Sequence, residues 1–503
     1  MGVARRFLFV GLLGVCLVAP VLSQTMPGTG VASPAETQRE IQQHIDHVTS
    51  GLTTPVIDKN DPHPGKSLTA EMAAMHVPGV SIAVVHNGII EWAQGFGVAA
   101  VGGNPVTAET LFQAGSISKP VAAMAALRLV QQGKLNLDAD INTYLTSWKL
   151  PASDAAAGKP VTLRELLTHT GGTTVHGFPG YAAGEPVPTL VQVLDGVKPA
   201  NTVAIRVETA PGTRWNYSGG GFTIMQQALI DVTAVNGKLG PFPQLMHDTV
   251  LAPIGMTHST YQQPLPAEWL AKAATPYDFD DKPIAGGAHT YPEMAAAGLW
   301  TTPSDLARYV IENQLSLEGK ANHVLSVEMT KQMMTAGMGN WGLGVQIGGS
   351  ASKPYFSHGG VDEGFEALFV GYEQGGDGAV VMTNARGGMR IAEEVMGSIA
   401  TEYGWPDFRP IVRSSISVDP KVLAQYVGTY ELSPTFSIAM TLEGNQLMTQ
   451  ATEQPKFPLH AESDTKFFLT VVDAEVEFFK NDKGVVAYMM LHQGGQDVKG
   501  VKK

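Results

Sequence analysis

Cysteine and charged residues are both scarce in this sequence. Cys16 is the only cysteine in 503 residues, and charged residues make up 16% of the chain. A lone cysteine excludes an intramolecular disulfide and any site built from several thiolates. The low charge, together with 44% hydrophobic residues, excludes a disordered or coiled-coil chain and indicates a globular protein with a sizeable core.

Basic residues are too few for a polyanionic partner. The chain has 33 Lys and Arg against 46 Asp and Glu, a formal net charge of −13 at pH 7. It therefore lacks the positive surface that binds nucleic acid or an anionic membrane. The expected partner is a small-molecule or peptide substrate.

The first 23 residues have the pattern of a secretory signal peptide. Two arginines precede an uncharged run from Phe7 to Leu22, and small residues follow. A membrane anchor is the alternative, but the run is shorter than the ~20 residues that a span needs, and Pro20 interrupts it. Cys16 lies inside this segment, so the mature chain would have no cysteine. We expect an exported protein, periplasmic or extracellular, without a stable membrane anchor.

Several common catalytic signatures are missing. The sequence has no H-E-x-x-H and no G-x-S-x-G elbow. A possible phosphate loop at Gly65-Lys66-Ser67 has Asn60 where its first glycine should stand. Metal, lipase-type and nucleotide chemistry are disfavoured, and we expect neither a metal nor an organic cofactor.

The order of the predicted elements indicates an α+β fold. A helix and loop over residues 24–64 precede a hairpin, because Asn87-Gly88 separates two β-branched runs. The stretch from about 120 to 335 is mostly helical in pattern, and strand patterns return at 366–372 and 379–383. We expect a domain over 65–404 with one antiparallel sheet built from both of its ends, flanked by helices and holding a helical insertion.

The end of the chain predicts a second unit. Past Trp405-Pro406 the pattern becomes short alternating strands, such as the one containing Ile438, Met440 and Leu442. Residues 415–503 are therefore expected to form a small all-β, barrel-like domain.

The strongest chemical signal is Ser116-Ile-Ser-Lys119. The S-x-x-K pattern also occurs at Ser350 and Ser463, so the tetrapeptide alone decides nothing. Ser116, however, opens a long apolar-striped helix, where residues three apart lie on one face. The helix N-terminus would supply backbone N–H groups near developing negative charge. Ser116 is the candidate nucleophile and Lys119 its base, because a neutral lysine can accept the hydroxyl proton.

Two further segments contain candidate site residues. Tyr217, just ahead of an apolar helix, could share the proton with Lys119; the alternative is a packed aromatic. His358-Gly359-Gly360-Val361 enters a predicted strand, where two glycines permit close approach of a ligand to the backbone. His358 alone is more often a structural histidine than a catalytic one. The order of the three segments carries more weight than any single residue.

Together these segments resemble the serine β-lactamase and penicillin-binding-protein superfamily. The resemblance is greatest to its class C branch, which includes family VIII carboxylesterases and D-aminopeptidases, and it covers about residues 65 to 402. The appended β domain resembles one often found on these hydrolases. Four segments carry the resemblance: Phe112 to Lys119, Leu163 to Gly172, Leu251 to Thr257 and Gly298 to Asp305.

The resemblance implies a role for each candidate residue. Ser116 would be acylated, Lys119 and Tyr217 would form the general-base pair, and the N–H groups of Ser116 and Val361 would form the oxyanion hole. His358-Gly359-Gly360 would replace the K-T-G motif beside the site.

Two departures weaken the case for an efficient β-lactamase. Gly219 stands where the lactamases have the asparagine of Tyr-x-Asn, and His358 replaces a lysine that attracts the β-lactam carboxylate. We expect His358 to titrate near ~6.5 and so to bind anionic groups in a pH-dependent way.

We therefore expect a secreted serine hydrolase that cleaves an ester or amide bond through a Ser116 acyl-enzyme. One alternative is a β-lactamase or D-alanyl-D-alanine carboxypeptidase acting on β-lactams or cell-wall peptides. The other is a non-catalytic ligand-binding protein that retains the fold.

Overall fold

The computed structural model describes residues 34–60, 65–434, 436–452, 454–493 and 496–503. The signal peptide expected over residues 1–23 lies outside these residues. None of the helices in the described ranges combines the length and the apolar character that a membrane span requires.

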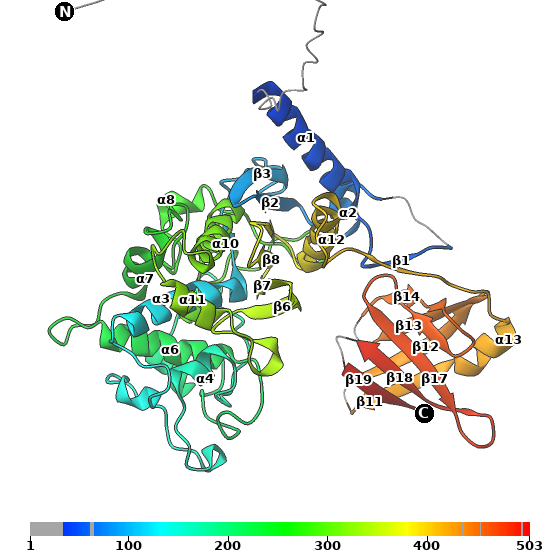
Figure 1. Ribbon diagram of the computed structural model, residues 1–503. Coiled ribbons are helices and arrows are strands. Elements are labelled where there is room, and N and C mark those ends of the chain that lie inside the picture. Colours follow the sequence, from blue (N-terminus) through cyan, green and yellow to red (C-terminus); the bar gives the residue numbers. More distant parts are fainter. Residues whose placement is uncertain (1–33, 61–64, 435, 453, 494–495) are drawn as a thin grey trace, which may run out of the picture.

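A six-stranded antiparallel sheet forms the centre of the larger domain (Figure 1). Its strand order is β3-β2-β9-β8-β7-β6, so strands from both ends of the domain meet in its middle. This confirms the predicted α+β sheet, and the Asn87-Gly88 turn joins β2 to β3. The strands are β2 (Gly79–His86), β3 (Ile89–Gly97), β6 (Gln346–Ser350), β7 (Lys353–Asp362), β8 (Phe365–Tyr372) and β9 (Gly378–Thr383).

Each face of the sheet packs against helices. Side chains alternate along a strand, so Val80, Ile82 and Val84 enter one core while Ala83 and Val85 enter the other. The first core lies under α1 (Pro34–Ser50), α2 (Leu68–Ala74) and α12 (Gly388–Glu402). The second lies under α10 (Pro303–Leu317) and the rest of the helical region. Apolar burial on both faces makes the sheet a rigid support for the site.

The region between β3 and β6 is less regular than its apolar pattern indicates. Only α3 (Ser118–Gln131), α6 (Gly219–Val232) and α10 reach 14 or 15 residues among the described helices of this region. Long irregular segments separate them, because proline and glycine recur between the apolar positions. The shorter elements are β4 (Phe112–Gln113), η1 (Gly115–Ile117), η2 (Ile141–Thr143), η3 (Asp154–Ala156), α4 (Leu163–Leu167), α5 (Leu190–Asp195), α7 (Phe242–Met246), η4 (His247–Leu251), α8 (Ala267–Leu270), α9 (Met294–Ala297), β5 (Trp300–Thr301), α11 (Val327–Met333) and η5 (Met338–Asn340).

The C-terminal unit is a nearly closed antiparallel barrel. Its nine strands run in the order β14-β13-β12-β11-β19-β18-β17-β16-β15, and its two edge strands are consecutive in the chain. Tyr426, Tyr430, Phe467 and Phe478 pack in its core. The elements are α13 (Pro420–Leu423), η6 (Ala424–Tyr426), β11 (Gly428–Ser433), β12 (Phe436–Glu443), β13 (Gln446–Ala451), β14 (Lys456–Pro458), β15 (His460–Ala461), β16 (Lys466–Phe468), β17 (Ala474–Lys480), β18 (Val486–Gln493) and β19 (Gln496–Lys502).

The segment before the sheet contacts both units. Strand β1 (Val56–Asp58) pairs in parallel with β10 (Ile411–Arg413), which leads into the barrel. The buried Asp58 carboxylate accepts the Ser415 N–H at 3.0 Å and contacts the His460 ring at 3.1 Å. Residues 56–58 therefore hold the start of the barrel beside the larger domain.

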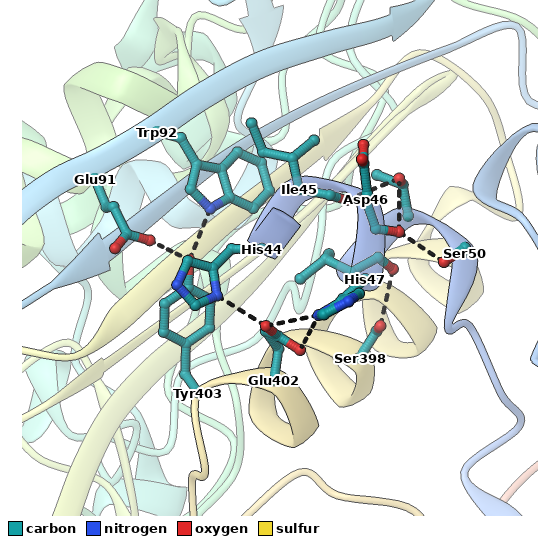
Figure 2. Close-up of polar contacts among 12 residues, drawn as sticks. His44, Ile45, Asp46, His47, Ser50, Glu91, Trp92, Ser398, Glu402 and Tyr403 are labelled. Carbon is teal, nitrogen blue, oxygen red and sulfur yellow. Dashed lines mark hydrogen bonds and ion pairs between the residues drawn. The ribbon is translucent and has the colours of Figure 1, made fainter. Parts of the chain in front are cut away.

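Helix α1 is fixed to α12 by a shared carboxylate (Figure 2). Oε1 of Glu402 lies 2.8 Å from Nδ1 of His44 and 3.0 Å from Nδ1 of His47. The His44 ring also stacks on Tyr403 at 5.1 Å between centroids. Burial raises the Glu402 pKa, but the hydrogen bonds from His47 and His44 outweigh it, so the pKa lies below its ordinary value. The charged form of Glu402 thus helps to hold α1 in place.

We expect Glu402→Gln to lower the free energy of unfolding by about 1 kcal/mol at pH 7, because both histidine contacts lose a charged acceptor. A carboxylate whose pKa is lowered in the folded state stabilises the fold at pH values above its ordinary pKa. This stabilisation is lost as the pH falls through the lowered pKa. The difference between the variant and the wild type should therefore shrink as pH falls below ~4.5. Urea unfolding at pH 7 and pH 4 measures it, with the exposed Glu40→Gln as the control. An effect of Glu402→Gln no larger than that of Glu40→Gln would contradict this account.

Candidate active site

Ser116 lies at the junction between the helical region and the sheet. It is half-buried in the 3₁₀ turn η1, directly before α3, rather than within the first turn of the long helix as the sequence indicated. Neighbouring groups fix this turn: the Ser118 hydroxyl donates to the Gly115 carbonyl at 2.6 Å and accepts the Leu299 N–H at 2.9 Å. The nucleophile candidate therefore stands on a well-supported turn.

Lys119 reaches back to Ser116 from the first turn of α3. Its Nζ donates to the Ser116 Oγ at 2.8 Å and to the Ala296 carbonyl at 2.8 Å. The residue is 2% exposed. Ala296 belongs to α9 and was missed in the sequence, because it acts through its backbone and its side chain gives no signal. The three-residue spacing brings the lysine amine into contact with the serine hydroxyl.

Tyr217 closes the other side of this pair. It lies just before α6, and its ring centroid is 5.0 Å from the Lys119 Nζ. In the described part of the chain, no hydrogen bond joins its hydroxyl to Ser116 or Lys119. Tyr217 therefore lies beside the serine–lysine pair, and it is the face of its ring that contacts the Lys119 amine.

The segment Gly359-Gly360-Val361 on β7 lies against η1. A Cβ built on Gly360 would lie 2.0 Å from the Ala114 carbonyl oxygen, and one on Gly115 would lie 2.4 Å from the Val361 nitrogen. Gly115 also has φ +50, which favours glycine. These glycines allow the backbones of η1 and β7 to touch, which brings the turn that contains Ser116 against Val361.

His358 is buried beside the site and is uncharged. Its Nδ1 lies 2.5 Å from the Gly359 carbonyl oxygen, and its Nε2 has no hydrogen-bond partner among the described residues. Burial and, next, the positive charge of Lys119 lower its pKa to about 3. The expectation that His358 titrates near ~6.5 and presents a pH-dependent cation was therefore wrong. An isolated sequence motif does not reveal that the ring is buried next to a lysine.

Phe178 occupies the space beside Gly219. A Cβ built on Gly219 would lie 2.8 Å from the Phe178 ring. An asparagine at this position, as in the lactamase Tyr-x-Asn motif, would require that ring to move. The departure seen in the sequence thus has a structural counterpart.

Aromatic rings and a cavity surround these residues. Trp341 lies 5.4 Å from the His358 ring and 5.8 Å from the Tyr217 ring, and Trp215 lies 5.7 Å from Trp341. A cavity of about 330 Å³ adjoins Val361 and is lined also by Phe178 and Tyr291. The same cavity is also lined by charged residues, Asp362, Glu363, Glu366 and Arg386, so apolar rings and charged groups both surround the site.

The other two S-x-x-K matches form no serine–lysine pair. The Ser350 hydroxyl contacts Ser352 and the Lys353 backbone, while the Lys353 amine pairs with Asp377. The Ser463 hydroxyl accepts backbone N–H groups in a turn of the barrel, and the Lys466 amine pairs with Glu462 and Glu475. Of the three matches, Ser116 alone has its hydroxyl against its lysine.

Comparisons with known proteins concern both units of the chain. The β-lactamase family model matches residues 66–399, and a domain of unknown function, DUF3471, matches residues 412–502. PbpX of Bacillus subtilis (strain 168), named as a penicillin-binding protein, is 27% identical over 325 residues, covering 62% of this chain and 71% of PbpX. A β-lactamase of Pseudomonas fluorescens is 29% identical over 279 residues, covering 55% of this chain and 71% of that protein.

Solved structures share the fold. The octameric penicillin-binding protein homologue from Pyrococcus abyssi aligns with a TM-score of 0.56 at 21% identity, covering 86% of this chain and 98% of that one. At this identity the likeness concerns the fold alone.

The buried His358 should make stability depend on pH. Unfolded His358 takes up a proton near pH 6.5, whereas the folded pKa is about 3, so the unfolded state binds more protons between these values and stability falls as pH is lowered. His358→Gln removes this group. Between pH 7 and pH 5 the free energy of unfolding should fall less in the His358→Gln variant than in the wild type, by roughly 1 to 2 kcal/mol. Guanidinium unfolding at the two pH values measures this difference, and the exposed His247→Gln is the control. If the free energy of unfolding falls equally in all three proteins, the folded state does not keep His358 from taking up a proton.

Proposed function

Because the β-lactamase family model matches residues 66–399, the chain belongs to this family of serine hydrolases, and we propose that it cleaves an ester or amide bond through an acyl-enzyme on Ser116. The observation that carries the proposal is the 2.8 Å contact between the Lys119 Nζ and the Ser116 Oγ. A serine hydroxyl is a poor nucleophile until a neighbouring base takes its proton. A non-catalytic ligand-binding protein would have no need to keep a buried lysine on a serine hydroxyl.

The proposed reaction assigns one task to each group. The Ser116 oxygen attacks the substrate carbonyl carbon, while its proton passes to the uncharged form of the Lys119 amine, with Tyr217 sharing it. The N–H groups of Ser116 and Val361 stabilise the oxyanion that forms. The alcohol or amine then leaves with a proton, and water releases the acid from Ser116 by the same steps in reverse.

Three features of the site favour an uncharged substrate. His358 is neutral at physiological pH, so it offers no cation to a carboxylate. Phe178 lies beside Gly219, where the lactamases have an asparagine, and the Trp341 ring packs against the rings of Tyr217 and His358. We therefore infer a neutral ester or amide with an apolar acyl group, in preference to a carboxylate-bearing β-lactam or a D-alanyl-D-alanine peptide.

Export is also part of the proposal. The pattern of residues 1–23 supports a secretory leader, which would place the hydrolase in the periplasm or outside the cell. Zymography of periplasmic and culture fractions tests this placement.

Ser116 should carry the covalent intermediate. We expect a chromophore burst equal to the enzyme concentration on mixing with a p-nitrophenyl ester, and Ser116→Ala should abolish it without unfolding the protein. Mass spectrometry after a slow acylating agent should place the adduct on the peptide that holds Ser116. Ser350→Ala and Ser463→Ala are matched controls and should keep wild-type activity. An adduct on either of those serines, or full activity in Ser116→Ala, would overturn the proposal.

The preference for an uncharged substrate over a carboxylate can be measured with two forms of one cephalosporin. A cephalosporin and its methyl ester share the β-lactam ring, but only the first carries a charged carboxylate. With opening of the β-lactam ring as the readout, we expect the neutral ester to have the higher kcat/KM, by ~10-fold or more. Since His358 stays neutral, its charge should not alter this ratio between pH 6 and pH 8. His358→Lys should shift the preference toward the free carboxylate, and His358→Gln should not. Preference of the wild type for the carboxylate would favour the β-lactamase alternative.

A further inference from the structure

His169 forms hydrogen bonds with the residues on both sides of Tyr217. Its backbone carbonyl accepts the Asn216 N–H at 2.8 Å, and its ring Nδ1 accepts the Ser218 N–H at 3.0 Å. Its ring lies against the Tyr217 ring, with 4.2 Å between centroids. One residue thus holds the backbone before and after the tyrosine and also contacts the tyrosine ring.

The local backbone conformation directs the His169 side chain toward residues 216–218. It follows α4, and its φ of +57 is uncommon for a residue other than glycine. The next two residues turn back, because the N–H groups of Thr170 and Gly171 both donate to the Glu165 carbonyl. This turn directs the imidazole into the protein, where it is 2% exposed and touches Phe222 and Trp341. A strained conformation of this kind persists where surrounding contacts over-determine it.

The ring must be neutral to accept the Ser218 N–H. Burial, then the positive charge of Lys119 and the neighbouring His358, hold the His169 pKa well below its usual range. At neutral pH the Nδ1 lone pair is therefore available, and the ring proton sits on Nε2, which has no hydrogen-bond partner in the described residues. A buried unpaired N–H costs free energy, so packing alone gives no reason for an imidazole here.

We propose that His169 is a positioning residue for the general base: its Nδ1 hydrogen bond to Ser218 holds Tyr217 beside Lys119, while its ring packs against the tyrosine. This inference rests on the proposed function, because it assigns Tyr217 to proton transfer from Ser116. It gives a role to a histidine that touches neither Ser116 nor Lys119 by a hydrogen bond in the described structure.

Two variants separate the hydrogen bond from the ring. In His169→Asn the amide oxygen can take the place of Nδ1, and asparagine tolerates a positive φ. His169→Phe keeps a planar ring but has no acceptor for the Ser218 N–H. Val193→Ala, a buried truncation on α5, serves as the control for a general loss of stability. Thermal unfolding of each variant gives the temperature range in which it is folded.

The readout is the rate of Ser116 acylation by a slow acylating agent, followed by mass spectrometry across pH. We expect His169→Phe to acylate at least ~10-fold more slowly than the wild type, on the scale of impaired base catalysis, with the acid limb of its pH profile displaced. His169→Asn should recover most of the rate. Val193→Ala should keep the wild-type profile when folded.

The outcomes distinguish the two proposals. A wild-type rate and profile in folded His169→Phe would refute the positioning role while leaving the serine hydrolase intact. An equal loss in His169→Asn and His169→Phe would show that the Ser218 hydrogen bond does not position Tyr217. Failure of the wild type to acylate at Ser116 would instead refute the proposed function.

Discussion

The candidate site depends on a direct backbone contact between η1 and β7. Gly360 leaves no room for a side chain against the Ala114 carbonyl, and Gly115 leaves none against the Val361 nitrogen. A methyl group at either position would separate the 3₁₀ turn from the strand. Ser116 would then lose its place beside the Val361 N–H, and Lys119, one turn further along, would move with it. The close approach of two glycines therefore sets the positions of Ser116, Lys119 and the Val361 backbone together.

Burial determines the charge pattern around Ser116. Lys119 has a hydroxyl and a backbone carbonyl as hydrogen-bond partners, and the two nearby histidines, His169 and His358, are both kept neutral by burial and by the lysine charge. The histidines offer hydrogen-bonding groups without adding positive charge. At neutral pH His358 therefore does not supply the positive charge that was expected of it from the sequence.

The segment before the sheet ties the architecture together. Helix α1 packs on α12 through Glu402, and β1 pairs with β10 at the entrance to the barrel. Both contacts join the start of the described chain to residues that follow the sheet (Figure 1). The barrel has a hydrophobic core of its own, and where the two units meet Asp58 contacts Ser415 and His460. The candidate site draws no residue from that junction.

Local patterns were sufficient to predict features that nearest neighbours decide. The Asn87-Gly88 hairpin and the approach of Lys119 to Ser116 both follow from turn geometry or spacing within a few residues. The sheet built from both chain ends also followed from the order of strand patterns. Long-range packing decided the features that the sequence did not predict. These are the neutral state of His358, the Phe178 ring beside Gly219 and the hydrogen bond between His169 and the residue after Tyr217. These properties depend on burial and on partners roughly 40 to 240 residues away in the chain, and a motif read along the sequence contains neither.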